Sequence, residues 1–243
     1  MSLRADVFLV EHGYAASRAE AQAAIRAGCV AADGRTVLKP SQPIPEDAEI
    51  SYERAHPYVS RGALKLIAAL DKFDLSPEGL VCLDVGASTG GFTEVLLERG
   101  AVKVYAIDVG HGQMHPRVAG DRRVLRRDGV NARDLGHQHV PEPVDAITVD
   151  VSFIGLKLVL PPTMKLAQRG GWMVALIKPQ FEVGRGHVGK GGIVKDGMVQ
   201  SAAVQEISAW LGGQGGWSVL GAMESPVVGG DGNREYLLAA RKK

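Results

Sequence analysis

Apolar residues in this chain recur in two patterns that alternate along most of its length. Short, mainly apolar segments with the length of buried strands cover 81–85, 103–108, 123–126, 144–150 and 171–178. Around these runs, apolar residues recur at helical spacing, as at 63–73 and 91–97. Strands that alternate with helices predict an α/β domain with a mostly parallel sheet. Two last strand-like segments, 217–224 and 235–240, predict an antiparallel C-terminal hairpin on that sheet.

The first 55 residues follow a different pattern and predict a separate small α+β domain. The expected order is helix, helix, hairpin and strand, at 4–11, 19–27, 29–37 and 48–52. Ser17 and Glu20 form a capping box for the second helix, and Asp33-Gly34 is a hairpin turn signal. This order resembles the S4 RNA-binding fold. A small protein-contact module is the alternative, because the segment holds six basic and eight acidic residues.

The proposed domain boundaries follow from these patterns. Residues 1–55 form the S4-like domain, 56–62 a linker that contains Pro57, and 63–243 the α/β domain. Segment 40–45, with a proline at each end, is expected to be irregular.

Several helix details are also predicted. The inward residues of the helix 63–73 are expected to be Leu64, Ile67, Ala68 and Phe73, with Lys65 solvated unless it gains partners. Ser60, Thr89 and Thr93 are candidate caps, and Pro161-Pro162 is expected to interrupt or end a helix that reaches Leu160.

Composition narrows the class of protein. Apolar residues make up 45% of the 243 positions and charged residues 23%, with a formal net charge of +1, as in ordinary globular proteins. Because the net charge is close to zero, any surface that binds nucleic acid would have to be a local cluster of basic residues. No apolar run approaches the roughly 18 residues of a membrane span, and no signal-peptide layout is present. Two cysteines predict a reducing, cytoplasmic setting, and no metal site is expected.

Candidate chemistry begins at the glycine-rich turn after the strand 81–85. The spacing is Asp-x-Gly-x-x-x-Gly-Gly from Asp84 to Gly91, which differs from the dinucleotide and Walker patterns. Glycines let backbone N–H groups approach a ligand, and the helix N-terminus favours a negative charge. An acid just before such a turn is typical of S-adenosylmethionine sites. An ordinary strand-to-helix turn is an equally good interpretation.

Two further acids follow the next strands. Asp108 ends the predicted strand 103–108, about 20 residues after the turn, where adenosyl cofactors have their ribose hydroxyls held. Asp128 follows the strand 123–126 and could accept from an adenine amino group, or simply offset neighbouring arginines.

Four charged residues at element ends, Lys65, Asp150, Lys178 and Glu235, are expected to meet at one edge of the sheet. Two lysines and two carboxylates suit methyl transfer to a hydroxyl, which needs a base or an orienting group. Bringing a lysine from a pKa of ~10.4 to near 7 costs about 4–5 kcal/mol. Lys178 is therefore either a general base or a group that steers the hydroxyl.

Taken together, the motifs resemble the TlyA (hemolysin A-like) family, which joins an S4 domain to an FtsJ/RrmJ-like ribose 2′-O-methyltransferase. The matching stretches cover nearly the whole chain and include 58–65, 84–93, 106–110, 131–133, 150–154, 177–182 and 225–235. The resemblance implies a Rossmann-like S-adenosylmethionine-dependent methyltransferase fold after the S4-like domain. It also implies a ribosomal RNA substrate, in 16S or 23S RNA or both.

The resemblance further implies roles for individual residues. Lys65, Asp150, Lys178 and Glu235 become the catalytic tetrad. The expected cofactor-binding residues are Asp84, Gly86, Ser88, Thr89, Gly90, Gly91, Phe92, Asp108, Val109, Asp128 and Asp150. The expected RNA-binding residues are Arg4, Arg18, Arg26 and Arg61.

Two other classes stay open at this point. One is an RNA-binding ribosome-assembly factor that keeps the fold without turnover, although the intact tetrad favours an enzyme. The other is a membrane-active haemolysin, which the lack of a spanning segment or a strongly basic amphipathic helix disfavours. The target nucleotide and the oligomeric state do not follow from the sequence.

Overall fold

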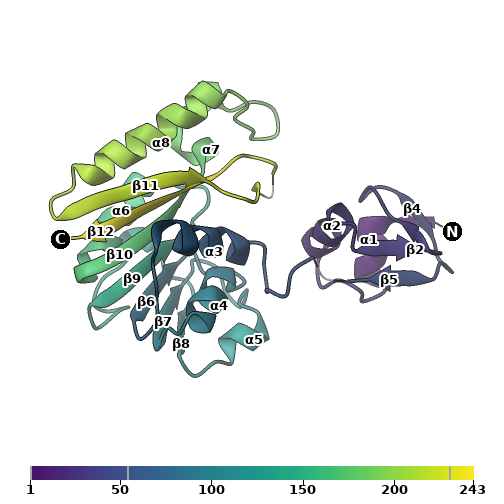
Figure 1. Ribbon diagram of the computed structural model, residues 1–243, viewed down its shortest axis with the longest axis horizontal. Helices are drawn as coiled ribbons and strands as arrows, with labels where there is room; N and C mark the ends of the chain where they lie inside the picture. Colours follow the sequence, from purple (N-terminus) through teal and green to yellow (C-terminus); the bar gives the residue numbers. More distant parts are fainter. Residues whose placement is uncertain (1, 54, 230) are drawn as a thin grey trace. The chain divides into compact units, whose positions relative to one another are not determined.

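A computed structural model describes residues 2–53, 55–229 and 231–243 of the chain (Figure 1). The polypeptide divides into two compact units, Met1–Pro57 and Tyr58–Lys243. This division lies within the segment 56–62 that we predicted as a linker. Arg54, which was counted among the basic residues above, lies outside the described residues.

The first unit contains two helices and two small sheets. The helices are α1 (Ala5–Glu11) and α2 (Arg18–Arg26), and the strands are β1 (Ser2–Arg4), β2 (Val30–Ala32), β3 (Arg35–Thr36), β4 (Pro43–Pro45) and β5 (Ile50–Tyr52). The backbone N–H of Glu20 donates to Ser17 Oγ at 3.3 Å, which caps α2 as predicted. Asp33 and Gly34 both have positive φ and form the turn that connects β2 to its antiparallel partner β3. The predicted hairpin is therefore confirmed.

One strand pair of this unit contradicts the sequence prediction. Segment 40–45 was expected to be irregular, but Pro43–Pro45 forms β4 and pairs antiparallel with β1, with Ile44 opposite Leu3. Ile44 is fully buried, so the apolar core holds the segment extended. A two-stranded ladder has only edge strands, which tolerate proline because its missing N–H can face away from the partner.

The second unit is built on one seven-stranded sheet in the order β11-β12-β10-β9-β6-β7-β8. The strands are β6 (Val81–Val85), β7 (Lys103–Ile107), β8 (Val124–Arg127), β9 (Val144–Val149), β10 (Ala167–Ile177), β11 (Trp217–Glu224) and β12 (Tyr236–Lys242). Strands β6 to β10 run parallel, whereas β12 is antiparallel to both β10 and β11. The predicted α/β fold with an antiparallel C-terminal hairpin is confirmed.

Helices cover both faces of this sheet (Figure 1). One face carries α3 (Gly62–Phe73), α4 (Gly91–Glu98) and the short α5 (Pro116–Ala119). The other carries α6 (Leu156–Lys165) and α8 (Gly197–Gly212), with α7 (Pro179–Glu182) packed on α8. Alternate strand residues supply the two cores, because successive side chains of a strand point to opposite faces. Cys82 belongs to the α3 side and Leu83 to the α6 side.

The inward face of α3 differs from the prediction. The buried residues are Ala63, Lys65, Leu66, Ala69 and Leu70, whereas Leu64, Ile67, Ala68 and Phe73 are only partly buried. The helix is apolar on more than one side, so its periodicity did not define one inward face. The helix is rotated from the predicted orientation so that Lys65 points inward, and a distant carboxylate described below makes this burial possible.

Helix ends and interruptions also differ from the predictions. Helix α6 continues through Pro161 and Pro162 to Lys165, because buried residues on both sides of the prolines, such as Leu160 and Met164, keep it packed on the sheet. Arg61, rather than Ser60, is the N-cap of α3. Helix α4 begins after Gly90, in a left-handed conformation that gives no side-chain cap, so neither Thr89 nor Thr93 is a cap.

Candidate active site at the carboxyl edge of the sheet

The site is centred where the chain order of the sheet reverses, between β6 and β9. The chain runs from β6 outward through β7 to β8 and then returns to β9 on the other side of β6. Gly86 follows β6 and Asp150 follows β9, and the Asp150 N–H donates to the Val85 carbonyl at 2.9 Å. A Cβ on Gly86, whose φ is +84°, would collide with the Asp150 carbonyl oxygen. Open α/β sheets bind ligands at such reversal points.

Asp84, the acid before the glycine turn, is fully buried under the site. Its carboxylate accepts from Thr93 Oγ1 at 2.6 Å and from Thr148 Oγ1 at 2.9 Å, so it ties β6 to α4 and to β9. Burial raises the pKa of Asp84 to about 6, even though the two threonine hydroxyls act in the opposite direction. With no exposed surface, Asp84 supports the turn from below and does not face a ligand.

Asp108 and Asp128 organise the loop that follows β7. Asp108 accepts from the Ser88 N–H and from the Gly110 N–H, both at 2.7 Å, and so joins this loop to the glycine turn. Asp128 accepts from the Gly112 N–H at 2.9 Å. Asp108 is only partly buried, and each carboxylate oxygen can accept a second hydrogen bond.

A cavity of about 390 Å³ opens beside this turn. Five residues predicted to bind cofactor line it: Gly86, Ser88, Asp108, Val109 and Asp150. The other predicted cofactor residues lie outside the lining: Asp84, Thr89, Gly90, Gly91, Phe92 and Asp128. Phe92 is buried in the core between α3 and α4, and Gly91 gives room to Ser60, where a Cβ would collide.

The lining fits an adenosyl cofactor chemically. Val109, Val130 and Ile154 offer apolar surface for a flat base, while Asp108, Asn131 and Asp150 offer acceptors for hydroxyl and ammonium groups. The glycine at 86 keeps side-chain atoms out of the narrow approach between β6 and β9.

Lys65 and Glu235 form a buried ion pair at the same edge. Lys65 Nζ lies 2.5 Å from Glu235 Oε2, and their side chains are 10% and 4% exposed. Lys65 comes from α3, and Glu235 directly precedes β12, which packs against α3. A buried charge is tolerated only with a partner, so this pairing accounts for the inward rotation of α3.

Lys178 and Asp150 form the second pair. Lys178 Nζ lies 2.7 Å from Asp150 Oδ1 and donates to Ser152 Oγ at 2.8 Å. Asp150 Oδ1 is buried, so the ion pair with Lys178 compensates its charge. The two side chains are 11% and 22% exposed, so the pair lies at the rim between core and surface.

Strand register brings the two pairs to the same edge. Ile177 on β10 lies opposite Tyr236 on β12, so Lys178 and Glu235 are the next residues beyond this pair, on adjacent strands. Asp150 follows β9, which is the other neighbour of β10. The four residues that the sequence singled out therefore lie at one end of three neighbouring strands, as two lysine–carboxylate pairs.

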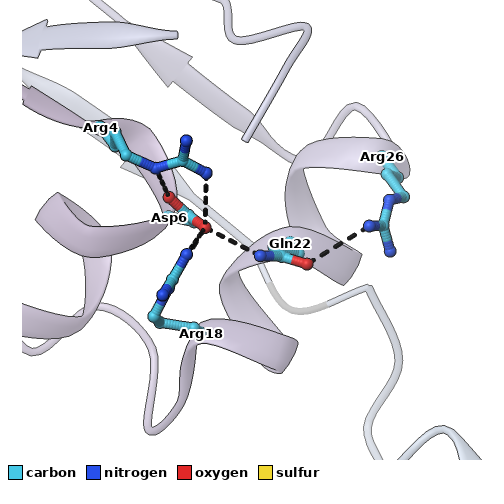
Figure 2. A network of polar contacts seen from close by, with 5 residues as sticks. All are labelled: Arg4, Asp6, Arg18, Gln22 and Arg26. Atoms are coloured by element: carbon cyan, nitrogen blue, oxygen red, sulfur yellow. Dashed lines mark hydrogen bonds and ion pairs between the residues drawn. The ribbon is translucent and has the colours of Figure 1, made fainter. Parts of the chain in front are cut away.

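The predicted RNA-binding arginines fall into two groups. Arg4, Arg18 and Arg26 belong to one polar network of the first unit, shown in Figure 2. Arg61 belongs to the second unit, at the start of α3.

Sequence reasoning assigned no role to Phe153, which is 89% exposed and lines the cavity. Its φ of +64° is unusual for an aromatic residue, and its ring lies 5.1 Å from that of Phe181. Gln113 and Asn131 also line the cavity without having been assigned. Their place near the ends of β7 and β8 was the available signal, because ligands contact residues that follow strands.

In the part of the chain that the structure describes, no helix is long and apolar enough to cross a membrane. Within the same residues, no cluster of three or more His, Cys, Asp or Glu side chains could hold a metal ion.

Comparisons with known proteins agree with this architecture. The FtsJ-like methyltransferase family matches residues 58–242, and the S4 domain family matches residues 3–50. The 16S/23S rRNA (cytidine-2′-O)-methyltransferase TlyA of Mycobacterium tuberculosis is 43% identical over 242 residues, which cover 98% of this chain and 89% of that protein. Hemolysin A of Brachyspira hyodysenteriae is 38% identical over 237 residues, with 97% and 98% covered.

Solved structures give the same result. A protein of Streptococcus thermophilus that carries a hemolysin designation superposes with a TM-score of 0.78 at 38% identity, covering 100% of this chain and 89% of that one. An O-methyltransferase of Bacillus cereus in complex with SAH shares the fold, with a TM-score of 0.51 at 17% identity over 76% of this chain and 82% of that one. With an S4 match followed by an FtsJ-like match, and with such relatives along nearly its whole length, the chain belongs to the TlyA (hemolysin A-like) family of FtsJ-like methyltransferases.

Proposed function

We propose that the protein transfers a methyl group from S-adenosylmethionine to a ribose 2′-hydroxyl of ribosomal RNA, with the first unit binding RNA. The observation that carries this proposal is the pair of lysine–carboxylate contacts at the edge of the sheet, one of which includes the cavity residue Asp150. The RNA methyltransferase names of similar proteins support ribosomal RNA as the substrate. Such a substrate would place the protein in the cytoplasm.

The cavity would hold the cofactor through residues that follow four strands, β6, β7, β8 and β9. Asp108 would accept from the ribose hydroxyls with the acceptor capacity that its two backbone contacts leave, while Val109, Val130 and Ile154 would enclose the adenine ring. The turn at Gly86 would let the amino-acid part pass close to the backbone. When bound, S-adenosylmethionine supplies an electrophilic methyl group on a positively charged sulfur.

Lys178 is the group best placed to act on the RNA hydroxyl. Its Nζ is fixed by Asp150 and Ser152 at the rim of the cavity, so it has little freedom to move away from a bound substrate. The 2′-hydroxyl would have to be held toward the methyl group that the cofactor supplies and would have to lose its proton, and Lys178 is placed to serve both needs. As an ammonium paired with Asp150, Lys178 would donate to the 2′-oxygen and steer it, or, after losing its own proton to solvent, would accept the hydroxyl proton.

Lys65 and Glu235 would complete the wall of the catalytic site. Their pairing holds a cation and an anion just before β12, beside Lys178, which follows β10. We assign them the positioning of the target ribose. The exposed ring of Phe153, on the segment that follows Asp150, gives a flat apolar surface on the same side.

Replacement of Lys178 tests the proposal. Purified Lys178→Ala protein should lose methyl transfer to ribosomal RNA from labelled S-adenosylmethionine by about 10²–10⁴-fold, the usual range for general acid–base catalysis. Binding of cofactor and of RNA should persist. Lys72→Ala, which removes an exposed lysine on α3, is the matched control and should retain activity. Mass spectrometry of the RNA products would identify the methylated nucleotide.

Two outcomes would contradict parts of this proposal. Methyl transfer by Lys178→Ala at the wild-type rate would remove Lys178 from the mechanism. If the wild-type protein binds ribosomal RNA but methylates none of its riboses, a non-catalytic RNA-binding role replaces the enzyme.

A further inference from the structure

A buried carboxylate lies beneath the arginine network of the first unit. Asp6, in the first turn of α1, has no exposed surface. Arg4 donates to both of its oxygens, with Nε 3.0 Å from Oδ1 and Nη2 3.2 Å from Oδ2. Arg18 donates to Oδ2 from Nη2 at 2.7 Å and from Nε at 3.3 Å. Gln22 is the third residue that donates to Oδ2, from Nε2 at 2.8 Å.

The guanidinium groups, in contrast, reach the surface. The side chains of Arg4 and Arg18 are 50% and 56% exposed. Each guanidinium uses two N–H groups on Asp6, so three of its five donors remain for an external acceptor. Figure 2 shows both groups converging on the carboxylate from different elements of the unit.

The shared carboxylate keeps the two arginines close together. The Nη2 atoms of Arg4 and Arg18 lie within about 6 Å of each other, because distances of 3.2 Å and 2.7 Å join them to the same Asp6 Oδ2. Two guanidinium groups at this separation would repel each other without an anion between them. Asp6 supplies that anion from below and leaves the outer side of both groups open.

The network extends to a third arginine. Arg26 Nη2 donates to Gln22 Oε1 at 3.3 Å, and Gln22 in turn donates to Asp6. Two guanidinium groups therefore contact the carboxylate and a third joins the network through Gln22, so the cluster keeps a net positive charge although the unit as a whole is not basic. This local charge is what a phosphate backbone requires.

Burial alone would raise the pKa of Asp6, but hydrogen bonds from Arg4, Arg18 and Gln22 outweigh it and hold the pKa well below its usual range. The carboxylate therefore favours its ionised form, which suits its contacts with the two guanidinium groups.

We propose that Asp6 is a positioning residue that aligns Arg4 and Arg18 as a rigid two-guanidinium clamp for the phosphate backbone of folded RNA. Arginine forks that are already ordered lose less side-chain entropy on binding than independent side chains do. This inference rests on the RNA-binding part of the proposed function and adds a residue that itself touches no RNA.

The sign of one mutational effect separates this proposal from simple electrostatics. Asp6→Asn removes a negative charge next to the binding surface, which by charge alone should strengthen RNA binding. If Asp6 positions the arginines, the same substitution should weaken binding about tenfold and make its salt dependence less steep, because fewer phosphates are contacted. Glu11→Gln is the matched control, since it removes the same charge from the exposed end of α1 and should leave binding unchanged or tighter.

The measurement is filter binding of the full-length protein to purified 16S and 23S ribosomal RNA without cofactor, between about 50 and 200 mM salt. Circular dichroism of each variant reports whether the first unit is folded. If Asp6→Asn does not fold, Arg18→Lys decides: it keeps the charge but loses the fork and should weaken binding severalfold. Arg35→Lys, on the exposed strand β3, should have no effect.

Folded Asp6→Asn protein that binds RNA as tightly as wild type, or more tightly, would overturn the proposal. So would equal binding by Arg18→Lys and Arg35→Lys, or a wild-type protein that binds no ribosomal RNA. A wild-type protein that binds RNA without methylating it would contradict the proposed enzyme activity alone, because the binding measurement does not depend on methyl transfer.

Discussion

The hydroxyl of Thr148 on β9 donates a 2.9 Å hydrogen bond to Asp84 on the adjacent strand β6. Thr93 on α4 donates to the other carboxylate oxygen at 2.6 Å. The acid before the glycine turn thus fastens together the elements on both sides of the site, β6, β9 and α4. Its contribution to the site is structural, and this gives it a measurable effect on stability.

The buried charge of Asp84 should make stability depend on pH. Its pKa of about 6 in the folded protein exceeds the ~3.9 of an unfolded aspartate, so its contribution is fully present below pH ~4 and is lost as pH rises through 6. The loss is on the order of 3 kcal/mol. Asp84→Asn lacks this titration. The difference in unfolding free energy, variant minus wild type, should therefore rise by about that amount between pH 4 and pH 7 in urea titrations. A difference that stays constant with pH would contradict the assignment.

Single and double variants of the Lys65–Glu235 pair should distinguish its effect on stability from its effect on methyl transfer. Lys65→Met or Glu235→Leu alone leaves a buried unpaired charge and should cost about 3–5 kcal/mol of unfolding free energy. The double variant should recover most of this loss, since no charge then lacks a partner, yet methyl transfer should stay at the level of the single variants. A double variant that regains activity would show that the pair serves only to hold α3.

Gly86 should tolerate no side chain. Gly86→Ala meets both a left-handed φ of +84° and the carbonyl oxygen of Asp150, so cofactor affinity should fall at least tenfold as Asp150 is displaced. Gly79→Ala is the control, because its φ of +71° is also left-handed but a Cβ there has open space. It should cost only about 1 kcal/mol of stability and leave cofactor binding intact. Calorimetric titration of both variants with S-adenosylmethionine makes the comparison.

The Asn233 side chain should hold the glycine-rich segment before α8 in place through two hydrogen bonds. It is 1% exposed, accepts from the Val194 N–H at 3.0 Å and donates to the Gly192 carbonyl at 2.9 Å. Asn233→Ala leaves these buried groups without partners, which should cost about 1–3 kcal/mol and speed amide exchange at Val194. Methyl transfer should fall too, since Glu235 is two residues away. Asp231→Ala, at an exposed position of the same turn, should change neither quantity.

Local patterns determined the elements of this protein. The glycine turn after β6, the Ser17 cap and the Asp33-Gly34 hairpin depend on residues a few positions apart, and the structure contains each of them. The alternation of strand and helix patterns was sufficient to predict a parallel sheet, because helices must cover both faces of its apolar strands. The last two strand patterns were sufficient to predict the antiparallel edge.

Only the tertiary structure decided how the charged residues pair. Lys65 and Glu235 were expected at the same edge of the sheet, but the helix pattern alone did not predict that Lys65 would be buried, because its partner lies 170 positions away. In the same way, Thr93 was predicted as a helix cap, but in the folded protein its hydroxyl donates to Asp84. Ile44 was predicted in an irregular segment, but it lies in a strand that pairs with β1. Spacing along a chain reports contacts within a helix or turn. Burial of a charge or a strand edge depends on the partner that the fold supplies.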